Sequence, residues 1–384
     1  MSRSSTESSS TASSPHPLSE VVRYFLRLGF TAFGGPAAHI AFMRRDLVQQ
    51  RRWLTDAEFV DLLGLTNLIP GPNSTEMTMH IGGLHAGWKG LWLAGLCFIA
   101  PAVVIVLALA WAYTRWGTTP TGEALIWGIQ PIILAIIVQA IWGLRPAAVK
   151  GRSTGIIACA AAALALAGVN DLLVLLTAGL IPLAGYHLRR STSSWRNAAA
   201  FVPFAMVSGG RPLGELFLIF LKIGGLLYGS GYVLFAFLED EFVNKREWLT
   251  GQQLVDAIAV GQFTPGPLFS SATFVGYLTA GWQGAAVATV GIFLPSFFLV
   301  MATRPLLPRL RGSRQMAPFL DGVNAAALAL MAVVTLKLGV DVIDSPARFV
   351  LVVAAAIVLV RFRTNTVWLV AAGAATGLAR ALVT

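Results

Sequence analysis

Pro70-Gly71-Pro72, which follows Trp53-Leu54-Thr55 in the first half of the chain, recurs as Pro265-Gly266-Pro267 after Trp248-Leu249-Thr250 in the second half. The repeat extends in both directions from this motif. The other matching pairs are Phe25-Leu26-Arg27-Leu28-Gly29 with Phe220-Leu221-Lys222-Ile223-Gly224, Asp61 with Asp256, Ala86-Gly87-Trp88 with Ala280-Gly281-Trp282, and Pro101 with Pro295. The chain therefore consists of two related halves. Many secondary transporters share this organisation, and their substrate site lies where the halves meet.

The composition is typical of a membrane protein. Of the 384 residues, 56% are hydrophobic and 12% are charged, and the mean hydropathy is +0.70. Soluble domains have about 25% charged residues. The formal net charge is +10, but the basic residues lie in short loops between apolar runs. They therefore indicate membrane topology rather than nucleic-acid binding, with a weaker hint of an anionic substrate.

The cysteine and histidine content argues against redox and metal chemistry. Only Cys97 and Cys159 are present, both in apolar runs, and the five histidines form no ligand motif. The sequence contains no G-x-x-x-x-G-K-[ST] motif for ATP and no dinucleotide fingerprint. We therefore expect no cofactor and no enzymatic activity, and a membrane-bound reductase is the least favoured function.

Apolar runs divide the chain into segments. Residues 1–19 form a Ser-rich tail, which we expect to be disordered and not a signal peptide. The first transporter repeat spans 20–188, a polar cytoplasmic linker 189–211, and the second repeat 212–384. A bilayer-spanning helix needs about 17–25 apolar residues. The predicted spans are 20–42, 88–114, 123–147, 153–169 and 171–188 in the first half, and 213–237, 281–303, 316–340, 347–361 and 364–382 in the second.

Each Pro-Gly-Pro motif separates two short amphipathic stretches. These are 56–69 and 73–87 in the first half, and 252–264 and 268–280 in the second. Proline in a helix interior costs about 3 kcal/mol or more, so the motif predicts a break between two short helices. At membrane depth, such a break survives only where protein or a water-filled cavity surrounds it. We interpret each pair as a re-entrant helical hairpin.

This count predicts an all-α integral membrane protein of about ten transmembrane helices, arranged as two inverted five-span repeats. An odd number of spans in each half requires the second half to be inverted, and the loop charges agree if the N-terminus lies outside. The basic residues of the cytoplasmic loops are then Arg44, Arg45, Arg51, Arg52, Arg145, Lys150, Arg152, Arg189, Arg190, Arg196, Arg211, Arg304, Arg309, Arg311, Arg314, Arg361 and Arg363. The external loops include Glu239-Asp240-Glu241, Asp341 and Asp344.

The chain resembles the chromate ion transporter family, in its long two-domain form. The resemblance rests on Phe33-Gly34-Gly35-Pro36 with His39-Ile40, Trp53-Leu54, Leu68-Ile69-Pro70-Gly71-Pro72-Asn73-Ser74-Thr75-Glu76, Ala86-Gly87-Trp88, Pro101 and Phe263-Thr264-Pro265-Gly266-Pro267. It implies export of chromate across a bacterial inner membrane, giving chromate resistance, with sulfate as a further candidate substrate. The second half departs from the motif, with Gly229-Ser230-Gly231 for Gly-Gly-Pro and Leu268-Phe269-Ser270-Ser271 for Asn73-Ser74-Thr75-Glu76. Two sites, if both exist, should therefore differ chemically.

Chromate is a tetrahedral dianion, so a carrier must replace its hydration with hydrogen-bond donors. A helix N-terminus provides unpaired N–H groups and about half a positive charge. The residues after each Pro-Gly-Pro motif lie at such a terminus. The predicted substrate-binding residues at the two breaks are Pro70, Gly71, Pro72, Asn73, Ser74 and Thr75, and Pro265, Gly266, Pro267, Ser270 and Ser271. The alternative is that the polar residues only cap short helices.

Two cations, Arg27 and Lys222, occupy equivalent positions in the first span of each half. A cation at mid-membrane costs roughly 2.5–3.5 kcal/mol on insertion scales, so it normally faces a cavity or a partner. We expect both to attract the dianion. The alternative is that they extend to the interface or pair with a carboxylate. The other arginines nearby are interpreted as a membrane anchor, Arg23, and as topology determinants, Arg44, Arg45, Arg51 and Arg52.

Two further features complete the predicted site. Gly34 and Gly35, before Pro36, are expected to interrupt the first span and expose backbone groups to substrate; the alternative is close helix packing. Glu76 is the candidate for proton coupling, because a transporter driven by protons needs a group that changes charge. The alternative for Glu76 is a salt bridge with Arg27 or a stabilising charge at a helix N-terminus.

The sequence thus predicts a secondary active transporter of chromate, acting as an antiporter in a bacterial inner membrane. Transport of sulfate or another anion, and an anion channel, are the alternatives, because the same donors suit any tetrahedral dianion. The expected partners are the dianion and the lipid bilayer, without nucleic acid. Homodimer formation stays open.

Overall fold

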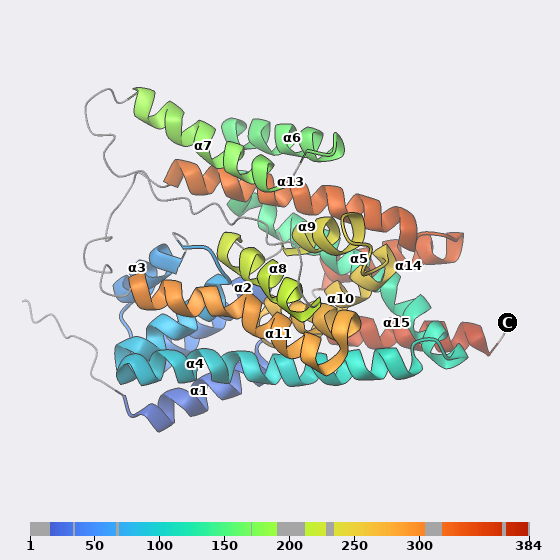
Figure 1. Cartoon of the computed structure of the whole chain (residues 1–384), viewed down its shortest axis with the longest axis horizontal. Helices are drawn as coiled ribbons and strands as arrows, with labels where there is room; N and C mark the ends of the chain where they lie inside the picture. The colour runs from blue at the N-terminus through green and yellow to red at the C-terminus, as the bar shows by residue number, and fades with distance from the viewer. Residues whose placement is uncertain are drawn as a thin grey trace, which may run out of the picture.

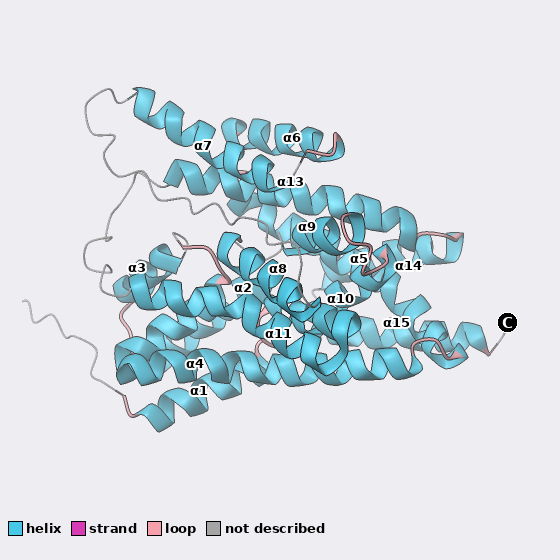
Figure 2. Cartoon of the chain, in the orientation of Figure 1, coloured by secondary structure: helices cyan, strands magenta, loops and turns pink. Residues whose placement is uncertain are grey.

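The fold is known from a computed structural model, which describes residues 16–33, 35–66, 69–169, 171–189, 212–227, 234–303, 317–362 and 366–382. All regular structure in these segments is helical, as Figure 2 shows, so the prediction of an all-α protein is confirmed. Residues 1–15, Gly34, residues 190–211 of the predicted linker, and Gly229-Ser230-Gly231 lie outside the described residues.

The first half contains seven α-helices among its described residues (Figure 1). They are α1 (Leu18–Thr31), α2 (Gly35–Met43), which continues into the π-helical turn η1 (Arg44–Gln50), α3 (Asp56–Thr66), α4 (Asn73–Trp116), α5 (Pro120–Ala148), α6 (Arg152–Leu166) and α7 (Asp171–Arg189).

The second half repeats this order. Its elements are α8 (Pro212–Leu226), α9 (Leu234–Leu238) with the π-helical turn η2 (Glu239–Asn244), α10 (Gly251–Phe263), the short 3-10 helix η3 (Leu268–Ser270), α11 (Ser271–Thr303), α13 (Ala317–Val342), α14 (Pro346–Phe362) and α15 (Thr366–Ala381). The predicted spans 88–114 and 281–303 lie within the longer helices α4 and α11, and the first span of each half is broken. Each of the other predicted spans corresponds to one whole helix, with ends that differ by a few residues.

The first predicted span, 20–42, is broken as expected. α1 ends at Thr31 and α2 begins at Gly35, whose φ of 76° lies in the region that favours glycine. Ala32 has extended backbone angles, and its N–H donates to the carbonyl of Leu28. The break therefore leaves the carbonyl of Ala32 outside the helix ladder and open to another partner.

α4 and α11 each reverse direction at one glycine. Gly87 has φ 63° and ψ −154°, and Gly281 has φ 60° and ψ −146°. Residues other than glycine rarely adopt these backbone angles. The arm 73–85 folds back onto 88–116, so that Gly82 packs directly on the backbone of Gly90. Gly276 and Gly284 make the same contact in the second half. The arm after each Pro-Gly-Pro motif and the long apolar helix thus form an antiparallel pair.

Glycine also brings the first helix of each half against the long helix. A Cβ atom at Gly29 of α1 would lie 2.8 Å from the carbonyl oxygen of Phe98, and one at Gly224 of α8 would lie even closer to the carbonyl oxygen of Ile292. α4 and α11 in turn pack on each other, where the rings of Trp92 and Phe297 stack at 4.5 Å. These four helices form one packed group, in which α1 and α4 lie along the lower edge of the view in Figure 1 and α11 and α8 lie above them.

The remaining helices are exchanged between the halves. α5 packs on α14 and α15, and α13 packs on α6 and α7. The contact of α5 with α15 and that of α13 with α7 are made at glycines, which permit close helix approach. Gly128 of α5 lies against the backbone of Gly373 in α15, and Gly322 of α13 lies against the backbone of Ala178 in α7. Each half therefore completes its core with helices of the other half.

Four helices in the described part of the chain are long and apolar enough to cross a membrane. They are Asn73–Trp116, Pro120–Pro146, Leu268–Thr303 and Asp321–Val340. Large apolar side chains such as Trp88, Trp142 and Trp282 are exposed on the surface, as expected of residues facing lipid. The protein is thus a multi-pass membrane protein, whereas the ten-span count stays a prediction.

Candidate functional site

The two Pro-Gly-Pro motifs meet the broken first helices of the opposite halves. The N–H of Gly71 donates to the carbonyl of Leu227, directly after α8, at 2.6 Å. The N–H of Gly266 donates to the carbonyl of Ala32, directly after α1, at 3.0 Å. Leu227 and Ala32 are equivalent positions in the repeat, so the two hydrogen bonds are the same contact made twice. We name this arrangement the crossing.

Both glycines of the crossing are required by geometry. Gly71 has φ 142° and Gly266 has φ 97°, a region that strains other residues. A Cβ atom at Gly71 would overlap the carboxylate of Glu76 and the hydroxyl of Ser296, and one at Gly266 would lie 2.8 Å from Cβ of Ala102. The flanking Pro70, Pro72, Pro265 and Pro267 end α3 and α10 and start the next helices.

The N-terminus of α4 presents buried hydroxyls at the crossing. Pro72 precedes the helix, and no side chain caps it. Asn73 is half-buried, whereas Ser74 and Thr75 are buried, and their hydroxyls have no hydrogen-bond partner among the described residues. The alternative that these residues are caps is therefore not supported at Ser74 and Thr75. Buried hydroxyls without a partner are costly, so such groups usually bind water or a ligand.

The second half presents fewer free donors. The hydroxyl of Ser270 is buried without a partner in the described part of the chain. Ser271 instead donates to the carbonyl of Leu268 at 2.9 Å, inside its own turn, so it acts locally. Thr273 shares a hydrogen bond with Thr289 at 2.7 Å.

Glu76 is completely buried in the first turn of α4, beside Gly71 and Ser296. Within the described residues, neither carboxylate oxygen makes an ion pair, and the Ser296 hydroxyl lies beside the carboxyl. The alternative of a salt bridge with Arg27 is not present. The alternative of a charge at a helix N-terminus agrees with its position.

The two glycines of the crossing have different neighbours. The repeat position of Glu76 is held by Ser271, and that of Ser296 is held by Ala102. Gly71 therefore faces a carboxyl and a hydroxyl, whereas Gly266 faces the methyl group of Ala102. The expected chemical difference between the two breaks is present in the structure.

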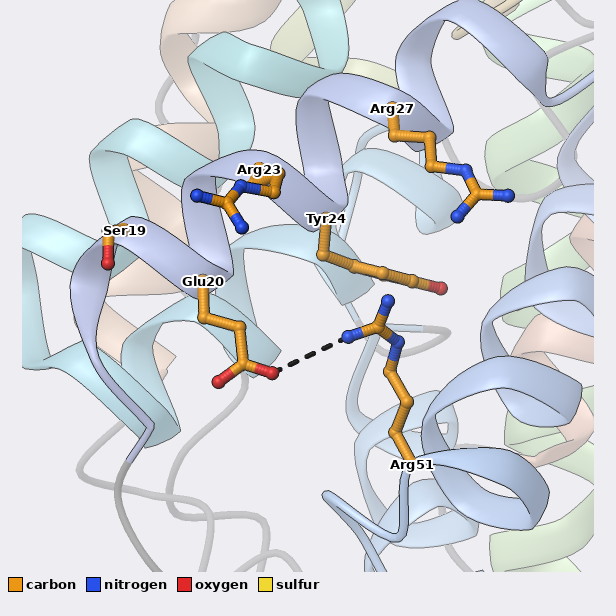
Figure 3. Close-up of a pocket in the computed structure, with 6 residues that line it drawn as sticks. All are labelled: Ser19, Glu20, Arg23, Tyr24, Arg27 and Arg51. Atoms are coloured by element: carbon orange, nitrogen blue, oxygen red, sulfur yellow. Dashed lines mark hydrogen bonds and ion pairs between the residues drawn. The ribbon is translucent and has the colours of Figure 1, made fainter.

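Arg27 lies in a cationic cavity (Figure 3). Two adjoining cavities, of about 360 and 270 Å³, share Tyr24, Arg27 and Arg51. In Figure 3 the Tyr24 side chain extends between the guanidinium groups of Arg27 and Arg51. The guanidinium of Arg51 stacks on Tyr24 at 5.3 Å and on Trp53 at 5.7 Å.

Lys222, the repeat equivalent of Arg27, has a carboxylate partner. Its ammonium group donates to Glu241 at 2.9 Å, and Arg246 binds both Glu241 and, at 2.7 Å, Glu215. Burial by itself would raise the pKa of Glu241, but the hydrogen bond and charge of Lys222, with Lys245 and Arg246, hold it below its ordinary value. At Lys222, then, the alternative of pairing with a carboxylate describes the structure.

His39 and Gly35 lie at the break after α1. The Nε2–H of His39 donates to the carbonyl of Ala32 at 3.0 Å, which is the same oxygen that Gly266 contacts. His39 and Gly266 thus hold the same carbonyl group at the crossing. Gly34 lies outside the described residues, so its predicted role stays a prediction.

Sequence reasoning missed Ser296, Tyr24 and the full setting of Asp256. Ser296 follows Pro295, so the repeat alignment with Pro101 was the available signal. Asp256 of α10 accepts hydrogen bonds from the Tyr113 hydroxyl and the Gln130 amide, both at 2.8 Å. These donors lie in the first half, on α4 and α5, and no sequence spacing indicates that contact.

Among the described residues, no group of three or more histidine, cysteine, aspartate or glutamate side chains could hold a metal ion. The polar groups gathered at the crossing are instead hydroxyls, backbone N–H groups at a helix N-terminus and one carboxyl.

Comparison with known proteins identifies the family. The family described as "Chromate transporter" matches residues 19–183 and again 214–378, which correspond to the two halves. A chromate transport protein of Cupriavidus metallidurans is 32% identical over 94% of this chain and 92% of its own length. A chromate transport protein of Pseudomonas aeruginosa is 33% identical over 84% of this chain and 82% of its own.

A probable chromate transport protein of Synechococcus elongatus is 31% identical over 84% of this chain and 86% of its own length. No solved structure is significantly similar to the chain. The family match covers both halves, and the relatives align over nearly the whole chain. The chain therefore belongs to the chromate transporter family, in which it has the long form with two repeats.

Proposed function

We propose that the protein is a secondary active transporter that binds chromate at the crossing and exports it from the cytoplasm of a bacterium. The observation that favours this site most is the group of buried hydroxyls without partners, Ser74, Thr75 and Ser270, beside two helix breaks. The relatives from C. metallidurans and P. aeruginosa are chromate transport proteins.

The chemistry of the crossing suits a tetrahedral dianion. The N-terminus of α4 offers backbone N–H groups, and Asn73, Ser74 and Thr75 add side chains of the donor type. Ser270 approaches from the other half. No lysine or arginine is required at the centre, because neutral donors bind a dianion without holding it so tightly that release fails. Sulfate has the same shape and charge, so we expect it to compete.

The transport mechanism we propose is alternating access between two inverted repeats of five spans, each with a re-entrant hairpin. The crossing connects each Pro-Gly-Pro motif to the opposite half, so a rocking motion of one half against the other would change both contacts together.

We propose that Glu76 couples transport to protons. A carboxyl buried without an ion-pair partner is costly when charged, and a dianion bound nearby would repel it. Binding of chromate and of a proton are therefore linked at this position. Glu76→Gln keeps the shape but cannot titrate. We expect this variant to exchange chromate between the two sides at near wild-type rates, and to lose the effect of a pH gradient on net flux.

The test of the proposal is chromate flux into everted membrane vesicles. Wild-type protein should give saturable uptake that excess sulfate inhibits and that collapse of the pH gradient abolishes. Ser74→Ala combined with Thr75→Val should lower the initial rate at low chromate concentration at least 10-fold, since each lost hydrogen bond to a charged group is worth about 1.5–3 kcal/mol. Saturable sulfate uptake without chromate uptake would assign a different substrate, and flux that never saturates would indicate a channel.

A further inference from the structure

The cavities around Arg27 have an excess of positive charge. Four arginines and two carboxylates line them: Arg23, Arg27, Arg45 and Arg51 with Glu20 and Asp46. Both carboxylates are already engaged, because Arg51 donates to Glu20 at 3.4 Å and Arg45 donates to Asp46 at 2.9 Å. In the described part of the chain, no carboxylate lies within ion-pairing distance of Arg23 or Arg27. The formal surplus is two positive charges, four arginines less two carboxylates.

The cavity also contains a donor without a partner. Tyr24 is 5% exposed, and its hydroxyl makes no hydrogen bond among the described residues. Figure 3 shows this side chain directed into the space between Arg27 and Arg51. A buried hydroxyl inside a cationic cavity is suited to donate to an anion bound there.

The equivalent region of the second half is neutral. Its charged residues are Lys222, Lys245 and Arg246 with Glu215, Asp240 and Glu241, and all six are joined by ion pairs. Four substitutions between the repeats produce the difference: Leu218 replaces Arg23, Ile219 replaces Tyr24, Asp240 replaces Arg45, and Lys245 replaces Gln50. The same backbone scaffold therefore has a cationic cavity in one half and a closed ion-pair network in the other.

We propose that the cavity lined by Arg23, Tyr24, Arg27, Arg45 and Arg51 is a second binding site, which captures the oxyanion before it reaches the crossing. This inference rests on the proposed function and extends it. The residues assigned from sequence to anchoring and topology, Arg23, Arg45 and Arg51, would then bind substrate.

A connection to the crossing follows from α1. Leu28 and Thr31 line the smaller cavity, and Ala32, the next residue, accepts the hydrogen bond from Gly266. An anion in the cavity is therefore one helical turn or less from the backbone that forms the crossing. The second half lacks such a surplus, so the capture site serves only one side of the transporter.

An oxyanion with this chemistry has two sources, free substrate and the phosphate of an anionic lipid. The two are distinguished by equilibrium binding of radiolabelled sulfate to purified protein, in nanodiscs of neutral lipid and in nanodiscs of anionic lipid. Sulfate capture requires binding in neutral lipid. If sulfate binds in neither membrane, and anionic lipid instead co-purifies in an Arg45-dependent way, the site belongs to lipid and the inference is wrong.

The decisive variants copy the second half. Arg45→Asp introduces the residue found at position 240, and Tyr24→Phe removes only the hydroxyl. The matched control is Arg44→Glu, which copies position 239 with the same change of charge, and Arg44 lies outside both cavities, paired with Asp56 on the surface. Exposed pairs of this kind contribute little to stability.

We expect Arg45→Asp to raise the KM for chromate about 10-fold or more, with an unchanged rate at saturation, because electrostatic attraction raises association rates about 10–10³-fold. The salt dependence of uptake should disappear with it. Tyr24→Phe should raise KM with the salt dependence intact. If wild-type vesicles transport chromate while Arg45→Asp matches Arg44→Glu in KM and salt dependence, the capture site is wrong. If wild-type vesicles transport no oxyanion, the proposed function itself fails.

Discussion

Gly71 and Gly266 are the residues on which the crossing depends most directly. Each combines a positive φ with a hydrogen bond from its N–H to the opposite half. Backbone strain of this kind costs about 1–3 kcal/mol in other residues. At Gly71 the added methyl group would also displace Glu76 and Ser296.

Gly71→Ala should therefore lower the melting temperature of the detergent-solubilised protein and reduce chromate uptake at least 10-fold. Gly64→Ala is the control, because Gly64 lies within α3 with open space around it. That substitution should be neutral or slightly stabilising, since alanine favours helices by about 1 kcal/mol over glycine. Equal melting temperatures for the two variants would show that the backbone at Gly71 is not strained.

At the scale of elements, the ion pair of Glu241 with Lys222 joins η2 to α8, and Arg246, just after η2, pairs with both Glu241 and Glu215 of α8. Because the folded-state pKa of Glu241 is lowered, its ionised form stabilises the folded protein at pH values above the unfolded pKa, about 4.3. This stabilisation is lost as the pH falls through the folded pKa.

Glu241→Gln should consequently be less stable than wild type at pH 7, and the difference should shrink as the pH falls below the unfolded pKa and through the lowered folded pKa of Glu241. Thermal unfolding in detergent across this pH range measures the effect. Glu58→Gln, in the exposed first turn of α3, provides a comparison outside the network. A constant difference between Glu241→Gln and wild type at all pH values would contradict the argument.

The elements were largely predictable from sequence, because apolar runs, prolines and glycines act locally. The breaks at Pro70-Gly71-Pro72 and Gly35 and the start of the long helix after Gly87 all follow from backbone preferences. The different settings of Arg27 and Lys222 were not predictable. Their flanking sequences are similar, and only the folded structure brings Glu241 to Lys222 while no carboxylate reaches Arg27.

At the scale of the whole molecule, the exchange of helices between the halves depends on small residues. Gly128 of α5 contacts the backbone of Gly373, and a side chain there would separate α5 from α15. The contact lies far in sequence from its partner, so no local pattern predicted it.

Gly128→Val should therefore reduce the amount of folded protein recovered from membranes several-fold, since overpacking costs typically 1–3 kcal/mol. Gly143→Val, on the same helix but with no atom near its Cβ position, should have a much smaller effect. Size-exclusion chromatography of both variants in detergent measures the difference. Equal recovery would show that the α5–α15 contact is dispensable.

The exchange also sets the order in which the protein can mature during synthesis. α5 leaves the ribosome early, but the helices it packs against, α14 and α15, are the last to be made. The first half must therefore wait in the membrane with one helix unpacked until translation is nearly finished. A premature stop codon that removes only α15 would take a packing partner from α5. Quality-control proteases would then recognise the exposed α5, far in sequence from the truncated end.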